Sequence, residues 1–541
     1  MADTYDVIIC GAGSGGGFMA GQIAPYGSVL ILDAGPSFPE AANPGVGVLS
    51  RRKLATQLNL GTWIPDSKNS NRGSVFFAYP MYMDRSNPFS STAQHEARLV
   101  GGGSAVNVGA WLRPRLVDWD GFASETGVTG WTKAAFEPHF QRAERILNVH
   151  RDSRAFWNKA SVLYEQAALS MGIPIVETAS NRKSCIFCGH RLNAGMPCKY
   201  DALMSTAVTQ IPKAIAAGAT LVDNATVVQV NITNKTATGV TYVRNGETIT
   251  VNANKLVVLS AGAIGTPLIL RDSGVYDINT NIGKYLRAHP GVPMDVLLPG
   301  NDWGQDRGYQ WNIHHQVIDG QGKPMDAVVH ASAGFMATTA WVAAAFQIGL
   351  FGKPYKDVMR QWRQRAGAFI FAMKPLITGQ VSGSLDAPTI SYPIATTTGN
   401  LEDKTLNDLL AGIRQVAAVY KKVGAFSAFP NPDTPDRVLK QQVSLFVTTS
   451  GALHPQGTCR AGSGPGNSVV DTNLMSWDIK NLMCNDASVI PNSLSANPNA
   501  TIMAVSSRAS DFVNQSILGA TNAPSAGQEM AQFAEQGASK L

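Results

Sequence analysis

The N-terminal segment of the chain places a glycine-rich turn directly after a short apolar run. Residues 5–10, Tyr-Asp-Val-Ile-Ile-Cys, are β-branched and apolar in the manner of a buried parallel strand. Gly11, Gly13 and Gly16 follow at G-x-G-x-x-G spacing. In this motif the first glycine allows a tight turn, the second lets a pyrophosphate approach the backbone, and the third lets the helix pack on the strand. The spacing predicts a helix over about residues 14–24, with its first N–H groups facing phosphate.

A second apolar strand and an acidic residue complete this unit. Residues 28–32, Ser-Val-Leu-Ile-Leu, end at Asp33, about 20 residues past the glycines, where a carboxylate accepts hydrogen bonds from ribose hydroxyl groups. A lone glycine motif is a weak indication, and a structural turn is the alternative, but here a strand, a helix and an acid accompany it. We therefore expect an α/β domain that binds a dinucleotide. The motif does not distinguish NAD from FAD.

Length and composition bound the class of protein. At 541 residues the chain is too long for one compact core, so two or more lobes are expected. Apolar residues make up 44% and charged residues 15%, as in a soluble globular protein. The net charge of +6 is small and no long Lys/Arg run occurs, so nucleic acid is not an expected partner. No apolar stretch has the length of a transmembrane helix; residues 342–350 are expected to form a buried helix.

The position of the first strand also bears on localisation. It begins at about residue 5, which leaves no room for a cleaved signal peptide before it. We expect a cytoplasmic protein, or a periplasmic one that is exported with a partner carrying the signal.

Other segments have clear local patterns. Asn245 and Gly246 separate two strand-like runs, residues 240–243 and 248–251, and predict a hairpin. Residues 255–260 read as a second buried parallel strand. Three further expectations are helices over residues 119–149 and 205–217 and an extended surface excursion, acting as a lid, over residues 35–87.

Several motifs, in order along nearly the whole chain, resemble the glucose–methanol–choline (GMC) oxidoreductases, FAD enzymes that oxidise alcohols. Residues 260–267, Ser-Ala-Gly-Ala-Ile-Gly-Thr-Pro, with residues 273–275 after them, resemble the second signature of the family. Residues 282–290 match the segment that usually follows. Residues 481–491 resemble the late cofactor-binding strand and turn. The resemblance favours FAD over NAD.

The resemblance implies a discontinuous Rossmann-like FAD-binding domain and a substrate domain with an antiparallel sheet flanked by helices. On this basis we assign residues 1–165, 205–295 and 450–520 to the FAD domain, 166–204 to a cysteine-containing insert, 296–449 to the substrate domain, and 521–541 to a polar tail.

The glycine motif and the resemblance together define the expected cofactor site. Some relatives attach FAD through a histidine that matches Val106 here, so non-covalent FAD is expected. The cofactor-binding residues are Gly11, Gly13, Ser14, Gly16, Asp33, Arg98, Gly102, Gly103, Ser104, Asn107, Val108, Ala261, Asp486, Ala487, Pro498 and Thr501.

Two polar residues near the C-terminus are the candidates for catalysis. Oxidation of an alcohol removes a hydride, which flavin accepts at N5, and a hydroxyl proton, for which an imidazole is a suitable base near neutral pH. By resemblance His454, in His-Pro-Gln-Gly-Thr, is that base, and Asn497 holds the substrate oxygen. The alternatives are a structural histidine and a turn residue before Pro498, with Asn499 as the nearby competitor.

A cluster of three cysteines is a separate signal. Cys185, Cys188 and Cys198 have C-x2-C-x9-C spacing, and three thiolates suit a [3Fe-4S] cluster, such as some sugar dehydrogenases of the family use to pass electrons to a cytochrome. The ending Met-Pro-Cys-Lys departs from their usual Cys-Pro. A zinc site completed by His190, a disulfide, and inert thiols are the alternatives.

The leading expectation for function is oxidation of an alcohol or sugar hydroxyl by FAD, with electrons passed to an external acceptor such as a cytochrome, and with a small subunit as a further partner. An oxidase that produces hydrogen peroxide is the runner-up, followed by a non-redox flavoprotein lyase and a non-catalytic flavin-binding subunit. The sequence does not identify the substrate. The aromatic residues within 296–440 can line a binding pocket or belong to the core, and His314 and His315 can line a pocket or lie on an exposed strand.

Overall fold

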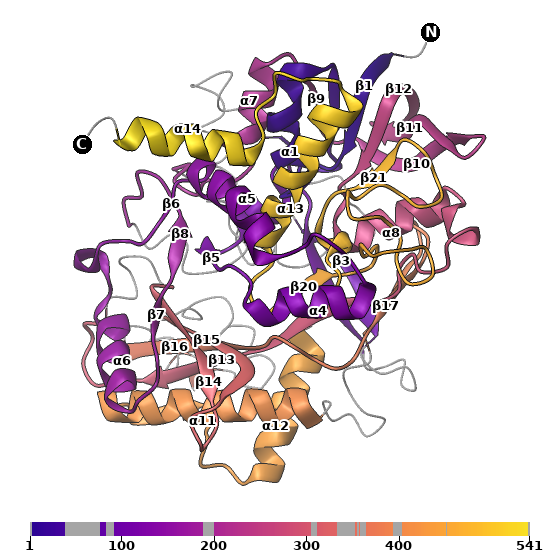
Figure 1. Cartoon of the computed structure of the whole chain (residues 1–541). Coiled ribbons are helices and arrows are strands. Elements are labelled where there is room, and N and C mark those ends of the chain that lie inside the picture. The colour runs from indigo at the N-terminus through magenta and orange to yellow at the C-terminus, as the bar shows by residue number, and fades with distance from the viewer. Residues whose placement is uncertain are drawn as a thin grey trace.

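The computed structural model describes residues 3–37, 76–82, 91–187, 198, 200–303, 311–332, 352–353, 356, 364–392, 403–450 and 452–538. Figure 1 shows two large sheets: one beside the N-terminal strand β1, and one at the opposite end of the molecule above helix α11. The predicted α/β architecture, with a Rossmann-like part and an antiparallel sheet, is confirmed.

The first sheet contains the predicted dinucleotide unit. Its strand order is β10-β11-β12-β1-β2-β9, with β21 on β12, where the strands are β1 (Thr4–Cys10), β2 (Val29–Leu32), β9 (Thr220–Val222), β10 (Thr226–Thr233), β11 (Thr236–Arg244), β12 (Glu247–Leu259) and β21 (Leu482–Cys484). The end of β12 lies parallel to β1, so the two strands predicted as buried and parallel are neighbours. The hairpin is confirmed: β11 and β12 pair antiparallel, and Asn245 and Gly246 turn with φ of 52° and 84°.

Helices cover this sheet and lead the chain to the other lobe. They are α1 (Gly16–Ile23), α4 (Leu116–Thr126), α5 (Lys133–Ile146), α7 (Gln210–Ala216), α8 (Gly262–Asp272), α13 (Asn499–Phe512) and α14 (Ala526–Ala538). Helix α1 packs between α7 and α13, and α5 lies between α13 and α14. The helical segment predicted over 119–149 is two helices, because Gly127 ends α4 in the left-handed region with φ of 67°.

The second sheet is antiparallel and has the order β19-β13-β16-β15-β14-β7, with β20 paired to β13. Its strands are β7 (Val176–Glu177), β13 (Arg287–Leu297), β14 (Ile313–Ile318), β15 (Pro324–Ser332), β16 (Arg365–Ala372), β19 (Ser427–Phe429) and β20 (Ala452–Gln456). Val292, Val329 and Ile370 of this sheet share a core with α6 (Lys159–Ser170), α11 (Asp403–Val423) and α12 (Asp436–Ser450). Because side chains alternate along a strand, the neighbouring residues face the other way. Strand β13 runs across the boundary placed at residue 295 from the sequence.

Smaller elements complete the described chain. They are β3 (Phe76–Tyr82), β4 (Ser91–Ala97), β17 (Gln380–Gly383) and β18 (Pro388–Ser391) in one sheet, β5 (Ala110–Trp111), β6 (Val149–His150) and β8 (Ala179–Asn181) in another, and α3 (Gly102–Val106). Most of the predicted excursion over residues 35–87 and the helix predicted over 342–350 lie outside the described residues. None of the helices in the described part of the chain is long and apolar enough to cross a membrane.

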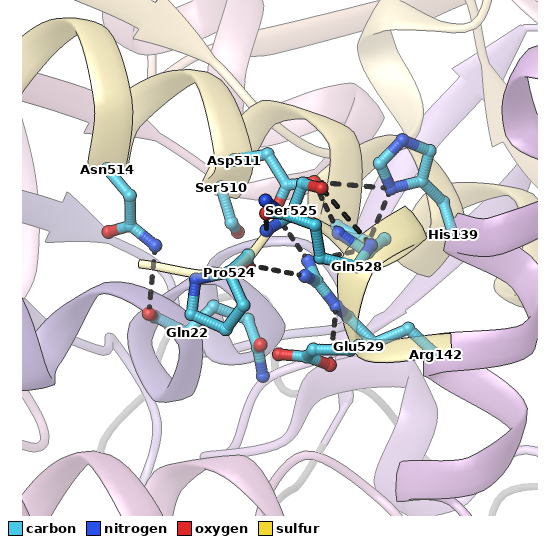
Figure 2. Close-up of polar contacts among 12 residues, drawn as sticks. Gln22, His139, Arg142, Ser510, Asp511, Asn514, Pro524, Ser525, Gln528 and Glu529 are labelled. Carbon is cyan, nitrogen blue, oxygen red and sulfur yellow. Dashed lines mark hydrogen bonds and ion pairs between the residues drawn. The ribbon is translucent and has the colours of Figure 1, made fainter. Parts of the chain in front are cut away.

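A buried arginine fixes the C-terminal helix to the rest of the molecule. Figure 2 shows the guanidinium of Arg142, on α5, enclosed by groups from the C-terminal segment. It donates to Asp511 Oδ1 at 2.6 Å, Glu529 Oε2 at 3.0 Å and the carbonyl of Pro524 at 3.0 Å, and is 1% exposed. The segment predicted as a polar tail therefore contains a helix, α14, tied down by a buried ionic cluster.

Candidate active site

The three motif glycines have different surroundings, and each matches the role that the motif predicts. A Cβ atom on Gly11 would lie 2.2 Å from the carbonyl oxygen of Ser260, and one on Gly16 would lie 2.0 Å from the carbonyl oxygen of Gly11. These positions are filled by protein, as a tight turn and a helix–strand contact require. The nearest atom to a Cβ on Gly13 is the Cα of Gly102, at 3.9 Å. The second glycine therefore borders open space, where a ligand can approach the backbone.

The acidic residue at the end of β2 organises this turn. Asp33 Oδ2 accepts a hydrogen bond from Ala12 N at 2.8 Å, and Oδ1 accepts one from Gly35 N at 2.8 Å. Burial raises the pKa of the Asp33 carboxyl to about 6, although the two backbone N–H groups work against this rise. Asp33 thus binds the glycine turn, and each carboxylate oxygen retains capacity for a further donor.

A second glycine loop docks on the first. Gly101 N donates to the carbonyl of Ala12 at 3.1 Å, and Ser104 Oγ donates to the carbonyl of Gly101 at 2.6 Å. Gly102 has φ of 47°, and a Cβ there would lie 2.9 Å from the Cα of Gly13. Nothing lies within 4 Å of a Cβ on Gly103. The two glycine loops, far apart in sequence, therefore form one cradle with open backbone at Gly13 and Gly103.

The late cofactor-type segment closes the cradle from the C-terminal side. Asp486 Oδ2 accepts hydrogen bonds from Gly262 N, at the start of α8, at 2.9 Å and from Thr266 Oγ1 at 2.5 Å. Burial raises the pKa of Asp486. Ser14 Oγ donates to Asn499 Oδ1 at 2.7 Å. Thr501 Oγ1 is buried and has no hydrogen-bond partner among the described residues, as expected of a group that faces a ligand.

The remaining residues assigned to the cofactor lie around this cradle or carry its loops. Arg98 donates to the carbonyl of Ala34 at the end of β2. The others are placed as follows: Asn107 accepts from Gly109 N, the Val108 carbonyl accepts from Arg182, Ala261 N donates to Thr266, Ala487 accepts from Gly457 N, and Pro498 caps α13.

His454 stands at an irregularity in the pairing of β20 with β13. Leu453 pairs with His289 and Gln456 pairs with Arg287, so two residues of β20, His454 and Pro455, oppose one of β13. His454 has φ of 63°, a left-handed conformation that costs a non-glycine residue about 1–3 kcal/mol. Bulges of this kind turn a side chain away from the regular sheet direction, and they recur next to active sites.

The His454 ring is oriented by His289. The two Nδ1 atoms lie 2.9 Å apart, so one of them carries the proton. Ser493 Oγ donates to the carbonyl of Met373 at 2.8 Å and lies 3.3 Å from His289 Nε2, from which it can only accept. Gln456 Nε2 is 3.4 Å from the same nitrogen and also donates to the carbonyl of His454 at 3.2 Å. Ser493 thus favours a proton on His289 Nε2, whereas the Gln456 amide N–H, which can only donate, favours an unprotonated Nε2. In the tautomer that Ser493 favours, the contact between the two Nδ1 atoms gives His454 an Nδ1–H and leaves the lone pair on His454 Nε2.

Burial sets the charge of these rings. It lowers the pKa of His454 to about 4, and it lowers the pKa of His289 well below 6.5, with His454 as a further cause. Both rings are therefore neutral near pH 7. A neutral imidazole with its Nε2 lone pair free has the form that a general base needs.

Asn497 lies beside this pair, and the structure separates it from its competitor Asn499. The acceptor oxygen of Asn499 is used by Ser14, whereas Asn497 Oδ1 is buried without a hydrogen-bond partner. His330, on β15, is next to both Asn497 and His454, which influence its pKa. Asn497 is thus close to His330 on one side, and two residues along the chain Asn499 is bonded to Ser14 of the first glycine loop.

The cysteine cluster is only partly described. Cys185 and Cys198 carry free thiols, Arg182 contacts Cys185 Sγ at 3.6 Å, and Cys188 and His190 lie outside the described residues. In the described part of the chain, no group of three His, Cys, Asp or Glu side chains is placed to hold a metal ion.

Comparison with known families accounts for the cradle and the histidine together. Family models described as GMC oxidoreductase match residues 38–291 and 377–506, which include the second glycine loop, His454 and Asn497. The chain belongs to the GMC oxidoreductase family. The GMC enzymes are flavoproteins, and the open backbone at Gly13 and the unpartnered hydroxyl of Thr501 fit FAD as the dinucleotide.

Individual relatives are distant but match over nearly their full length. The chain is 26% identical to a 2-methyl-1,2-propanediol dehydrogenase from Mycolicibacterium austroafricanum, over 95% of this chain and 96% of that protein. It is 24% identical to a 5-(hydroxymethyl)furfural oxidase from Methylovorus, over 95% and 99%. The structure of a formate oxidase from Aspergillus oryzae superposes with a TM-score of 0.72 at 18% identity, covering 97% of this chain and all of that one, and supports the GMC fold.

Two histidines of this GMC site were not predicted. His289 lies inside the motif at residues 282–290, but its contact with His454 joins segments 165 residues apart. His330 gives only a weak signal, a single polar ring within the apolar end of a strand. Of the two histidines that were considered, His315 is buried against Tyr164, with Nε2 2.8 Å from the phenol oxygen, so it does not lie on an exposed strand.

Proposed function

We propose that this protein uses FAD to oxidise an alcohol or sugar hydroxyl to a carbonyl, with His454 as the general base. One observation carries the proposal: among the described residues Asn497 Oδ1 is buried without a partner, His454 makes its ring hydrogen bond through Nδ1 and not Nε2, and both residues influence the pKa of His330. An alcohol needs such a pair, one group to take the hydroxyl proton and one to hold the oxygen.

When bound, FAD supplies the acceptor for the hydride that leaves the carbinol carbon. The protein groups have separate tasks. His454 Nε2 takes the hydroxyl proton, and the contact of its Nδ1 with His289 keeps the ring in the tautomer that can do so. The amide of Asn497 holds the substrate oxygen. The N–H of this amide donates to that oxygen and so stabilises the negative charge that develops on it.

Replacement of His454 tests the proposal directly. The His454→Ala variant is expected to retain FAD, because His454 makes no contact with the glycine cradle, and to lose most of the rate of flavin reduction by alcohols in anaerobic stopped-flow measurements. His150→Ala, which changes an exposed histidine, is the control and should reduce at the wild-type rate. Normal reduction in His454→Ala would refute the assignment. Any alcohol that bleaches the bound flavin also dismisses the lyase alternative.

The acceptor of the electrons is the second part of the proposal. We favour an external carrier, such as a cytochrome, over oxygen, and the three cysteines as the ligands of a [3Fe-4S] relay. The measurement is iron and acid-labile sulfide per flavin in protein purified without oxygen. About three irons per FAD would support the relay. Flavin without iron would assign the cysteines a structural role, and formation of hydrogen peroxide during turnover would then establish the oxidase alternative.

A further inference from the structure

His330 lies on the face of the antiparallel sheet that carries the active site. It pairs with His314 of β14 on one side and with Phe369 of β16 on the other. Its neighbours in sequence, Val329 and Ala331, point into the core shared with α11, so the His330 ring points to the opposite face. The side chain has no exposed surface.

Aromatic rings surround His330 on this face. The ring centroid of Trp311 lies 4.8 Å away, that of His314 5.7 Å and that of Phe371 5.8 Å. Phe371 in turn lies 5.3 Å from the His454 ring. His330 is therefore a polar group in an aromatic setting, one ring removed from the proposed base.

Neither nitrogen of His330 has a hydrogen-bond partner among the described residues. Nδ1 and Nε2 are both buried. The amide of Asn497 is close enough to raise the pKa of the ring through a polar contact, but neither nitrogen is in hydrogen-bond geometry with it. The other buried histidines on this sheet are satisfied: His314 Nδ1 bonds Thr178 Oγ1 at 2.8 Å, and His315 Nε2 bonds the Tyr164 hydroxyl at 2.8 Å. An unsatisfied buried polar atom costs about 1–3 kcal/mol. A bound ligand that forms hydrogen bonds with the ring nitrogens of His330 would remove this cost.

The charge of the ring limits what that partner can be. Burial lowers the pKa of His330 well below 6.5, and the nearby His314 and His454 lower it further, so the ring is neutral. A neutral imidazole donates one hydrogen bond and accepts another. The side chains that shift the pKa of His330 are His314, His454, His315 and Asn497, which include no carboxylate and no ammonium group. The partner is thus a neutral oxygen-bearing group: a hydroxyl, carbonyl or ether.

We propose that His330 recognises a second oxygen of the substrate, carried on the carbon next to the one that is oxidised. The inference rests on the proposed function, in which Asn497 holds the reacting oxygen. Because Asn497 and His330 are adjacent, an oxygen that reaches His330 lies only about three bonds from the reacting oxygen, as in O–C–C–O. The substrates of this class are vicinal diols, α-hydroxycarbonyl compounds and hydroxymethyl groups on oxygen heterocycles.

The test compares 1,2-propanediol with 1-propanol, which differ only in the second hydroxyl. For the wild-type holoenzyme with a dye acceptor, kcat/KM is expected to favour the diol by about 10- to 100-fold, the contribution of one satisfied buried hydrogen bond. In His330→Phe the ratio should fall to near one through a loss on the diol alone. His330→Asn, which keeps a donor and an acceptor, should retain part of the preference.

His314→Phe is the matched control, because it changes a neighbouring ring on the same sheet face whose Nδ1 is already bonded. It should leave the diol preference intact. A wild-type ratio near one, or an equal loss on both substrates in His330→Phe at unchanged FAD content, would overturn the inference while leaving the proposed function standing. Failure of every alcohol to reduce the wild-type flavin would instead overturn the proposed function, and this inference with it.

Discussion

The Nδ1 atoms of His289 and His454 face each other at 2.9 Å across the β13–β20 pair, with their rings inclined at 76°. A single proton joins them, so the tautomer of His454 is decided by a residue that comes 165 positions earlier in the chain. Ser493 holds the far side of His289, which extends the chain of hydrogen bonds to the loop before α13.

We predict that His289 acts on turnover and not on substrate binding. His289→Phe removes the acceptor for His454 Nδ1–H, so kcat should fall by about 10- to 100-fold, the range typical of groups that orient a functional histidine, with KM nearly unchanged. His289→Asn keeps an acceptor and should recover part of the rate. Ser493→Ala should have a smaller effect in the same direction. A rise in KM at constant kcat in His289→Phe would contradict this role.

The activity should extend to unusually low pH for a histidine base. His454 acts when it is unprotonated, and burial lowers its pKa from 6.5 to about 4. The value of kcat/KM for flavin reduction is therefore expected to stay level from pH 7 to about pH 5 and to decline as the pH falls through about 4. Flavin absorbance recorded at each pH shows that the holoenzyme is intact. An acid limb near pH 6.5 would mean that the base is exposed or is another residue.

The motif glycines should separate into two classes on substitution. Gly16→Ala places a Cβ 2.0 Å from a carbonyl oxygen, so the protein should be destabilised even without FAD. Gly13→Val meets little protein but projects into the cradle, so the apoprotein should fold and unfold as the wild type does while FAD affinity drops. Gly464→Ala, in open space, is the control. Thermal unfolding of the apoproteins and FAD content measure the two effects; equal loss of stability in the Gly13 and Gly16 variants would contradict the distinction.

Arg142 should contribute far more to stability than its neighbour Arg145. Both contact Glu529, but Arg142 is 1% exposed and Arg145 is 44% exposed. Arg142→Ala leaves Asp511 and Glu529 without their buried cation and should lower the free energy of unfolding by about 3–5 kcal/mol. Arg145→Ala should cost about 1 kcal/mol or less. Urea unfolding of the two variants measures both losses in the free energy of unfolding. Similar losses would show that the cluster in Figure 2 is solvated.

Features that depend on residues close together in the sequence could be predicted, and contacts between distant segments could not. The glycine turn at Gly11 and the hairpin at Asn245 are set by a few adjacent residues, and both were predicted. His454 and Asn497 were found through family motifs. The contacts of His330 were not predicted, because they depend on the register of three strands. The residues next to His330 in the sequence do not show which residues of the other strands lie beside it. Cys188 lies outside the described residues, so the iron–sulfur hypothesis stays a prediction.

Strand β13 belongs to both lobes at once. Its second half lies within the antiparallel sheet, between β16 and β19, while its first half pairs with β20, which carries His454 and leads back to the FAD cradle. A swing of one lobe away from the other would pull apart this pairing and separate His454 from His289. We therefore expect the two lobes to move as one unit, with His454 and His289 held at fixed spacing.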